Sequence, residues 1–485
     1  MAVMLGACAT AATPASPPVP TEAQALLATE TSPTRKSAVE NGLRAPVAVA
    51  GAPDPGANIR DRMAYYGVPA VSIAVAIDGK LAWADGYGEG IDASTVFQAA
   101  SMSKAVAATG IVTLAAREGL DIDADITPHL GAFDLAAVNP KGVTVTLRKL
   151  LSHTAGATVS GFPGYATGKT IPSNLEVVAG SDHTNTDPVT IDLQAPNAFR
   201  YSGGGYQIAQ LVAENVADRR FAQIMAELVL EPTGMTSSTF AQPLPASFVQ
   251  DHAIAKAHNR GPVAVEGGWH IYPEQAAAGL WTTPSDYIRF ALAIMAAADG
   301  QTEAGLAPQV VEALLTPVSE DYALGFGLPK DDEGRVRLQH GGSNEGYKCL
   351  FVAFPDRGAA LVVMTNADPG FLLAQEIARG AAATYDWPSE KVREVVPVPL
   401  TEAASSRIVG RYSAEEGKDV LFTITEAEGH RIVGATTNGI PLMLLHLGDD
   451  QFIDPSDGEE AQFVIDEASV VVDSGGQRFV RMPQP

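Results

Sequence analysis

The sequence predicts a mixed α/β (α+β) protein that ends in a small all-β domain. Up to about residue 390, long segments with helical spacing of apolar residues alternate with short apolar runs bounded by turn residues. After residue 408 the chain consists almost entirely of short β-runs separated by Gly, Asp and Asn turns. Closely spaced strands of this kind are typical of a small antiparallel barrel or sandwich.

Composition narrows the possible functions. The chain has 485 residues, of which 46% are hydrophobic and 18% charged, as in globular proteins of two or three domains. Its net charge of −24 argues against binding to nucleic acids or to anionic membrane surfaces. The two cysteines, Cys8 and Cys349, provide no disulfide framework, and no stretch reaches the length of a transmembrane helix.

Residues 1–55 are expected to be a signal remnant followed by a disordered lead. Leu5 to Cys8 is similar to a bacterial lipobox, whose cysteine carries a lipid, but the basic residues and longer apolar run of a full signal are missing. One interpretation is a truncated signal, with Cys8 as a lipid anchor and a periplasmic or cell-envelope location. The other is a small-residue N-terminus without function, which leaves a cytoplasmic location open. The Ala-, Pro- and Thr-rich residues that follow are typical of a tether.

Residues 56–390 are expected to form the main domain, followed by a linker over 391–407 and the β domain over 408–485. A long loop in the main domain is expected to be an active-site wall, and three consecutive glycines are expected to allow a close backbone approach at a tight turn. The expected elements are an amphipathic helix after Asn58, a hairpin turning at Asp78-Gly79, a helix from Ser101, the loop over 157–196, a helix after Gly203 to Gly205, a helix capped by Thr283 or Ser285, and strands within 338–366.

Ser101 and Lys104 head one of these helices and are the first candidate site. Side chains one turn apart lie on the same helix face, so the serine hydroxyl and the lysine amine can meet. Amides of a first helical turn lack intrahelical partners and, together with the helix dipole, favour negative charge such as an oxyanion. This is the arrangement that a covalent serine hydrolase needs.

The same pair has a plainer interpretation, an N-cap serine followed by a solvated lysine. A Ser-x-x-Lys motif occurs by chance about once in a chain of this length, so it carries little weight alone. It is, however, the only such motif in this sequence. Lys104 also lies among small apolar residues, where a buried amine is costly without a purpose.

Later segments supply the other groups that a nucleophilic serine needs. A buried lysine cation beside a tyrosine favours the phenolate, which would let Tyr201 act as a base. The glycines after His340, Gly341 and Gly342, would let a substrate lie against a sheet edge as an extra strand. His153 is a candidate base as well, but we favour a turn histidine that hydrogen-bonds to backbone. The histidines lack metal-ligand spacing, so no metal or other cofactor is expected.

Together, these motifs resemble the class C β-lactamase, penicillin-binding protein and family VIII esterase group of serine hydrolases. The family's Ser-x-x-Lys motif matches 101–104, its Tyr-x-Asn motif falls on 201–203, and its Lys-Thr-Gly or His-x-Gly motif falls on 340–342. The resemblance covers about residues 55–385. It implies a β-lactamase/transpeptidase-like domain with a central antiparallel sheet flanked by helices. Supporting segments are LLSHTAG at 150–156 and GLWTTPSDYIRF at 279–290.

The resemblance implies a chemical role for four side chains. Ser101 would be the nucleophile, and Lys104 with Tyr201 would transfer protons. His340 would sit beside the site, polarising Tyr201 or contacting substrate.

The resemblance also implies a binding site made of backbone. The N–H groups of Ser101 and Ser343 would form the oxyanion hole, next to Gly341 and Gly342 in the substrate-binding strand. Two departures weaken an assignment as a β-lactamase. Gly203 replaces an asparagine that contacts the lysine and the substrate amide, and a histidine replaces the lysine that holds the substrate carboxylate.

The implied function is a serine hydrolase that cleaves amide or peptide bonds of small molecules or short peptides through a Ser101 acyl-enzyme. YSGGGY at 201–206 fits the esterase and peptidase branch, and the C-terminal β domain resembles the lipocalin-like module of D-aminopeptidase-like enzymes. Two alternatives use the same residues: a carboxylesterase, and a penicillin-binding sensor that is acylated without turnover. A non-catalytic structural protein would require all three motifs to be coincidental. The oligomeric state is not indicated.

Overall fold

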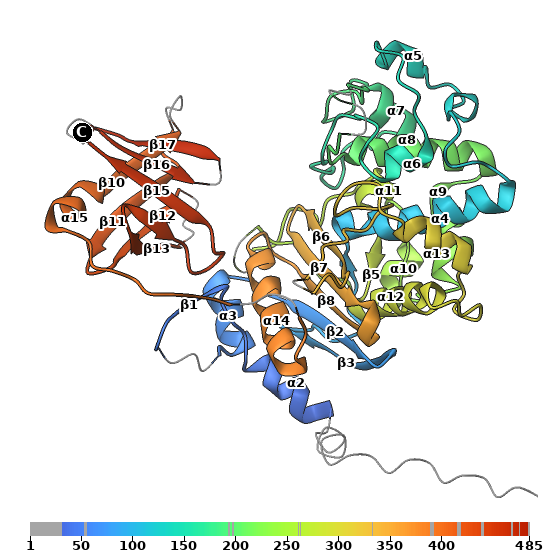
Figure 1. Ribbon diagram of the computed structural model, residues 1–485. Helices are drawn as coiled ribbons and strands as arrows, with labels where there is room; N and C mark the ends of the chain where they lie inside the picture. The colour runs from blue at the N-terminus through green and yellow to red at the C-terminus, as the bar shows by residue number, and fades with distance from the viewer. Residues whose placement is uncertain are drawn as a thin grey trace, which may run out of the picture.

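The computed structural model describes residues 32–483 except 53–55, 193–194, 196–197, 260, 262, 332, 389–391, 415–418, 438–440, 467–468 and 475. Cys8, the lipid anchor in one of the two interpretations of the N-terminus, lies outside the described residues. Figure 1 shows two parts, which we call the sheet region and the barrel, joined by an extended segment. This mixed architecture confirms the predicted fold class.

The sheet region is built on five antiparallel strands in the order β3-β2-β8-β7-β6. The central strand β8 is buried along its whole length, and β6 forms one edge. The turn between β2 and β3 has positive φ angles of 52° at Asp78 and 73° at Gly79, which confirms the predicted hairpin. The strands are β2 (Val71–Ile77), β3 (Lys80–Tyr87), β6 (Leu338–Asn344), β7 (Tyr347–Phe354) and β8 (Ala359–Thr365).

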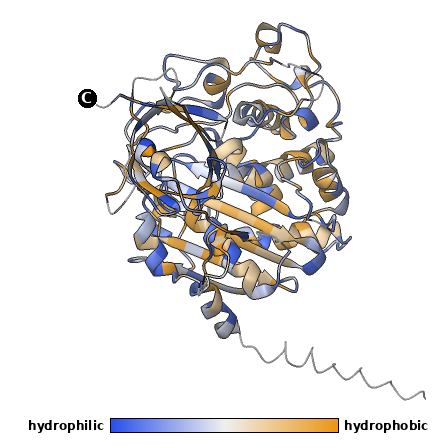
Figure 2. Ribbon diagram, turned by 60° about the vertical axis from the view of Figure 1, so that its left-hand side comes forward, coloured by the Kyte–Doolittle hydropathy of each residue, from blue (hydrophilic) through white to orange (hydrophobic). Residues whose placement is uncertain are grey.

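Helices cover both faces of this sheet (Figure 1). One layer contains α2 (Ser32–Glu40), α3 (Ile59–Tyr66) and α14 (Gly370–Tyr385), and the other contains α4 (Ser103–Glu118) and α12 (Pro284–Ala298). Strand β2 shows how the sequence separates the layers, because Val71, Ile73 and Val75 pack with the first and Ala74 and Ala76 with the second. Figure 2 accordingly shows the strands between the helices as largely hydrophobic.

Most of the remaining elements lie on the side of the sheet that α4 and α12 cover. Helix α12 begins with the predicted cap, since the Thr283 hydroxyl accepts from the Asp286 N–H and Pro284 follows as the first helical residue. The other elements are β4 (Phe97–Gln98), η1 (Ala100–Met102), η2 (Thr127–His129), α5 (Leu135–Val138), α6 (Leu147–Leu151), α7 (Asn174–Ala179), α8 (Gly203–Ala217), α9 (Phe221–Met225), η3 (Ala226–Leu230), α10 (Ala246–Asp251), α11 (Gln275–Ala278), β5 (Trp281–Thr282), α13 (Pro308–Leu315) and η4 (Pro355–Arg357).

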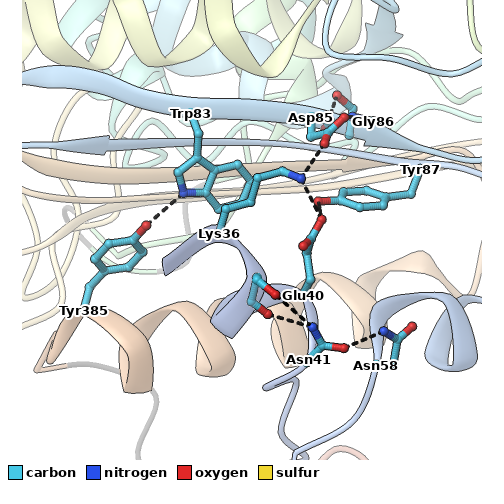
Figure 3. Close-up of polar contacts among 11 residues, drawn as sticks. Lys36, Glu40, Asn41, Asn58, Trp83, Asp85, Gly86, Tyr87 and Tyr385 are labelled. Atoms are coloured by element: carbon cyan, nitrogen blue, oxygen red, sulfur yellow. Dashed lines mark hydrogen bonds and ion pairs between the residues drawn. The ribbon is translucent and has the colours of Figure 1, made fainter. Parts of the chain in front are cut away.

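The structure differs from the predicted disordered lead after residue 31, because α2 is folded onto the sheet region. The Lys36 amine lies 2.8 Å from a Glu40 oxygen and 2.7 Å from an Asp85 oxygen of β3. The Tyr87 hydroxyl donates to Glu40 at 2.7 Å (Figure 3). The contacts to Asp85 and Tyr87 join residues about 50 positions apart, so the composition of the segment carries no sign of them.

The predicted linker over 391–407 also contains regular structure. Strand β9 (Arg393–Val395) pairs in parallel with β1 (Val47–Val49), so that segments from both ends of the sheet region form a two-stranded ribbon. Helix α15 (Glu402–Ile408) follows. Val47 and Val395 of the ribbon pack against Leu445 and Ile453 of the barrel. The ribbon therefore attaches the barrel to the sheet region.

Eight strands form a closed barrel in sequence order, β10 to β17. Its interior is filled by side chains, including Tyr412, Phe452 and Phe463, with ring centroids of the last two 4.7 Å apart. Ile408 of α15 joins this core. The strands are β10 (Gly410–Ala414), β11 (Phe422–Glu428), β12 (Arg431–Thr436), β13 (Pro441–Gly448), β14 (Gln451–Ile453), β15 (Glu460–Ile465), β16 (Val470–Ser474) and β17 (Gln477–Arg481).

Candidate active site

Ser101 lies on the 3₁₀ turn η1, directly before α4. Ala100, the residue before it, has a φ of 50°, a left-handed conformation that costs energy for a residue with a Cβ. The backbone of β6 passes against this turn, because a Cβ added at Gly342 would collide with the Ala99 carbonyl oxygen. Gly342 is thus required for the edge strand to reach the serine turn.

Lys104 meets Ser101 as the helical spacing predicts. Its Nζ lies 3.1 Å from Ser101 Oγ and donates to the Ala277 carbonyl of α11 at 2.9 Å. Only 1% of the Lys104 side chain is exposed. The interpretation as a solvated lysine is therefore wrong.

Tyr201 joins the same cluster through the face of its ring. Lys104 Nζ lies 4.9 Å from the Tyr201 ring centroid, and the His153 ring centroid lies 4.4 Å from it. Among the described contacts, none joins the Tyr201 hydroxyl to Ser101 or to the lysine amine. The structure thus brings the three side chains together, with the amine over the phenol ring.

The glycines after Tyr201 allow the close backbone approach that the sequence predicts. A Cβ on Gly203 would lie 2.8 Å from a ring carbon of Phe162, and one on Gly204 would lie 2.5 Å from the Thr158 carbonyl oxygen. The Ser202 hydroxyl caps α8 by accepting from the Gly205 N–H. Part of the long loop over 157–196 therefore lies directly against the Tyr201 turn.

His340, Gly341 and Ser343 lie on the edge strand β6. The N–H and C=O groups of Gln339 bond to Gly327 on the outer edge of the sheet. Backbone groups of alternate residues point to the same side of a strand, so the N–H groups of Gly341 and Ser343 point to this outer edge too. The Ser343 side chain is exposed.

Tyr322 is a residue that the sequence reasoning missed, and it links two histidines. His153 Nδ1 accepts from the Ser202 N–H at 3.0 Å, so its Nε2 carries the proton and donates to the Tyr322 hydroxyl at 3.2 Å. His340 Nδ1 donates to the Gly341 carbonyl at 2.6 Å, which leaves its Nε2 to accept from the Tyr322 hydroxyl at 3.3 Å. One orientation of the tyrosine proton satisfies both histidines.

Both histidines are neutral in this arrangement. Burial, with a further contribution from Lys104, lowers the pKa of His340 to about 4. The same two causes, in the same order, hold the pKa of His153 well below its usual range. His153 hydrogen-bonds to backbone as we favoured, and it also contacts the Tyr201 ring. His340 is no counterpart to a lysine cation at neutral pH.

One feature of the cluster has a weak sequence signal, and another has none. Tyr322 comes shortly before Gly325, where a Cβ would lie 2.8 Å from the Lys104 carbonyl oxygen, and before Gly327 at the β6 edge. These glycines are the signal that could have pointed to this loop. The Ala277 carbonyl, which accepts from Lys104, has no side-chain signal at all.

With this geometry established, comparison with known proteins identifies the family. Residues 56–385, more than half of the chain, match the sequence model of the family described as Beta-lactamase. This chain belongs to the beta-lactamase family of serine hydrolases. The match confirms the resemblance that the motifs indicate.

The curated relatives are distant. Protein flp of Staphylococcus aureus (strain N315) is 22% identical over 335 residues, which cover 63% of this chain and 61% of that protein. Esterase EstB of Burkholderia gladioli is 28% identical over 203 residues, covering 39% of this chain and 50% of that enzyme. The chain thus spans about three fifths of the length of the first relative.

Solved structures share the fold at low identity. The octameric penicillin-binding protein homologue from Pyrococcus abyssi is 19% identical with a TM-score of 0.58, covering 87% of this chain and 98% of that one. The D-amino acid amidase from Ochrobactrum anthropi SV3, complexed with L-phenylalanine amide, is 18% identical with a TM-score of 0.51, covering 73% and 98%. At these identities the likeness shows the fold alone.

None of the described residues forms a group of three or more histidines, cysteines, aspartates or glutamates that could hold a metal ion. Within the same part of the chain, no helix is both long enough and apolar enough to cross a membrane.

Proposed function

We propose that the protein cleaves amide or peptide bonds of small substrates through an acyl-enzyme on Ser101. The observation that carries the proposal is the 3.1 Å contact between Ser101 Oγ and Nζ of Lys104, an amine that is almost fully buried. Among the described residues no carboxylate pairs with this amine, and its other hydrogen bond goes to the Ala277 carbonyl. An amine buried without a carboxylate partner supports a catalytic role rather than a structural ion pair.

The proposed chemistry uses Lys104 and Tyr201 as a proton-transfer pair. The Ser101 oxygen attacks the substrate carbonyl carbon while its proton passes to the pair. The C–N bond then breaks, and the pair returns the proton to the leaving nitrogen. Water attacks the resulting ester and frees the acid and Ser101. The N–H groups of Ser101 and Ser343 would stabilise the oxyanion.

The neutral His340 supports substrates other than β-lactams. A lysine at this position would offer a cation to a substrate carboxylate, whereas His340 donates to the Gly341 carbonyl and accepts from Tyr322. Its pKa of about 4 keeps it uncharged at neutral pH. We therefore expect slow or undetectable β-lactam hydrolysis.

A carboxylesterase is the second candidate, and the match to Esterase EstB favours it. The D-amino acid amidase shares only the fold and is compatible with the amide proposal. Ester and amide hydrolysis would use the same residues and differ in the leaving atom. Measured rates on matched pairs decide which bond the protein prefers.

The test compares amides and esters of one acyl group with the wild type and three variants. We expect turnover to be abolished in Ser101→Ala and to fall about 10²–10⁴-fold in Tyr201→Phe and in Lys104→Ala. Ser94→Ala, which changes an exposed serine of the same region, is the matched control and should keep full activity. Unchanged rates in Ser101→Ala would refute the proposal, and near-normal rates in Tyr201→Phe would remove this tyrosine from the mechanism.

A further inference from the structure

A cavity of about 720 Å³ lies beside Tyr201 and the edge strand β6. Four aromatic side chains line it: Phe199, Tyr201, Tyr322 and Phe371. His340 and Gly341 contribute the wall from β6, whereas Ser101 is not among the lining residues. The cavity therefore borders the proposed proton-transfer residue rather than the nucleophile.

This position decides which half of a substrate the cavity can hold. When the scissile bond breaks, the leaving atom takes a proton, so it must lie within hydrogen-bond reach of the donor. In the proposed mechanism that donor is the Lys104–Tyr201 pair. The rest of the leaving group then extends past Tyr201, into the cavity that this tyrosine lines.

The cavity walls are suited to an aromatic ring. Phe199 keeps 47% of its surface exposed, although its ring centroid lies 5.7 Å from that of His153 and 5.4 Å from that of Tyr322. Phe371, at the start of α14, lies over β6, since a Cβ on Gly341 would be 3.3 Å from its ring. Phe371 is thus held beside the strand and Phe199 beside Tyr322, and both offer ring surface to a further ring.

The charged side chains disfavour an anionic leaving group. Glu320 and Asp321 line the same cavity, and both are exposed. One guanidinium, that of Arg337, also lines it, so two carboxylates against one cation leave a formal charge of −1. A carboxylate on the bound ring would be repelled by this excess.

We propose that this cavity is the leaving-group site and selects substrates whose leaving amine or alcohol carries an aromatic ring without a carboxylate. The proposal rests on the proposed hydrolase function and adds the substrate class. In the acylation step, the Ser101 oxygen forms the new ester bond, the bond from the carbonyl carbon to the leaving nitrogen or oxygen breaks, and the serine proton ends on the leaving atom. The free aromatic amine or alcohol then departs from the cavity.

The test varies the leaving group while the acyl group stays the same. Butyryl amides of n-propylamine, benzylamine and 4-carboxybenzylamine, with the matching esters in parallel, are compared by kcat/KM. The aryl group is one methylene away from the leaving atom, which limits differences in chemical reactivity. We expect about tenfold or more higher kcat/KM for the benzyl than for the propyl compound, and a loss of this advantage in the 4-carboxybenzyl compound.

Variants of the two cavity phenylalanines test whether the preference for a benzyl group arises in this cavity. Phe199→Ala and Phe371→Ala should each reduce the benzyl-to-propyl ratio several-fold, while the rate of deacylation, which involves only the common butyryl-enzyme, stays unchanged. The matched control is Tyr65→Ala, because Tyr65 is also an aromatic residue with 47% exposure but lies on α3 and does not line the cavity. That variant should leave the ratio as it is.

The reverse reaction gives an independent readout. By microscopic reversibility, an amine bound in the leaving-group site can attack the butyryl-enzyme in place of water. With p-nitrophenyl butyrate as donor, benzylamine should therefore yield more amide product than n-propylamine at equal concentration. This measurement does not depend on how well a group leaves.

The outcomes separate this inference from the function on which it rests. A benzyl-to-propyl ratio near one, or a ratio that both phenylalanine variants leave unchanged, would overturn the leaving-group assignment while a Ser101 adduct still supported the hydrolase. A change in deacylation rate in the variants would place the acyl group in the cavity and also overturn the assignment. No adduct and no turnover with any compound would overturn both proposals.

Discussion

At the scale of single residues, the hydroxyl of Tyr322 connects the two histidines of the site. Its hydroxyl accepts from His153 and donates to His340, whose tautomers are set by the backbone contacts of their Nδ1 atoms. Tyr322 does not contact the proposed nucleophile in any described interaction, so we regard it as a positioning residue. Its effect on the chemistry would be transmitted through the two histidines that contact the Tyr201 ring.

The first prediction concerns Tyr322→Phe. The Tyr322 hydroxyl donates to His340 Nε2 and thereby stabilises the neutral ring. Losing this donor should therefore raise the pKa of His340 from about 4. If the neutral form is needed, wild-type activity falls as the pH drops through about 4, and the acid limb of the variant moves to higher pH. We also expect an activity loss of about 10- to 100-fold at neutral pH.

The measurement is the pH profile of kcat/KM, combined with NMR titration of the histidines. A merely structural role for Tyr322 would lower activity by the same factor at every pH. An unshifted acid limb and an unshifted His340 titration would therefore contradict the positioning role.

At the scale of elements, the site depends on backbones that approach each other closely. Strand β6 reaches the Ser101 turn only because Gly342 has no side chain, and α8 starts against the loop at Thr158 only because Gly204 has none. Gly205, the next residue, is different, since the nearest atoms to an added Cβ are 3.5 Å away. The three consecutive glycines thus have unequal roles.

The second prediction compares the two neighbouring glycines of α8. Gly204→Ala should destabilise the fold by about 1–3 kcal/mol, because the new methyl group collides with a backbone carbonyl. Gly205→Ala should instead stabilise it, by up to about 1 kcal/mol, since alanine favours a helix over glycine and meets only ordinary contacts here. Denaturant unfolding of both variants checks this prediction. Equal changes in the free energy of unfolding would contradict the claim that Gly204, unlike Gly205, is needed for close packing.

The third prediction concerns the packing of α3 on α14 through Glu376, which does not line the cavity beside Tyr201. Arg62 binds the carboxylate of Glu376 with two hydrogen bonds of 2.7 and 2.6 Å, and the Tyr66 hydroxyl donates to it at 2.8 Å. Glu376→Ala leaves a half-buried guanidinium without its partner and should cost about 3 kcal/mol. The stability loss is measured by thermal unfolding. We expect kcat of the folded enzyme to stay unchanged, and a large fall in kcat would show that the contact between α3 and Glu376 supports the site.

Local sequence patterns predict much of the fold and part of the site. The Asp78-Gly79 hairpin, the Thr283-Pro284 helix start and the meeting of Ser101 with Lys104 each depend on neighbouring residues, which is why spacing alone predicts them. Tyr322, the Ala277 carbonyl and the docking of α2 by Lys36 depend on segments far apart in the chain, and a single sequence does not show which distant segments meet. The predicted signal remnant and the first part of the predicted lead, over residues 1–31, lie outside the described residues.

At the scale of the whole molecule, the barrel is attached through a small apolar contact. Val47 and Val395 pack on Leu445 and Ile453, and Arg393 forms an ion pair with Glu460. The residues that line the cavity beside Tyr201 all lie between 199 and 375, so none comes from the barrel. The chemistry is therefore expected to reside in the sheet region.

The fourth prediction follows for a chain that ends at residue 396. It should still form the Ser101 adduct at a rate similar to the full-length protein, while its melting temperature falls because Val47 and Val395 lose their apolar cover. Leu445→Ala in the full chain, which weakens the same contact without removing the barrel, serves as the control. Complete loss of adduct formation in a folded truncation would show that the barrel contributes to the site.

The central claim is that Ser101 becomes acylated, and peptide mapping of the quenched reaction tests it most directly. The protein is mixed with butyryl benzylamide or butyryl benzyl ester, quenched in acid within the first turnovers, digested and analysed by mass spectrometry. We predict a butyryl group on the peptide that contains Ser101, absent in Ser101→Ala and accumulated when deacylation is slow. A butyryl group on a different residue, or turnover that persists in Ser101→Ala, would contradict the account.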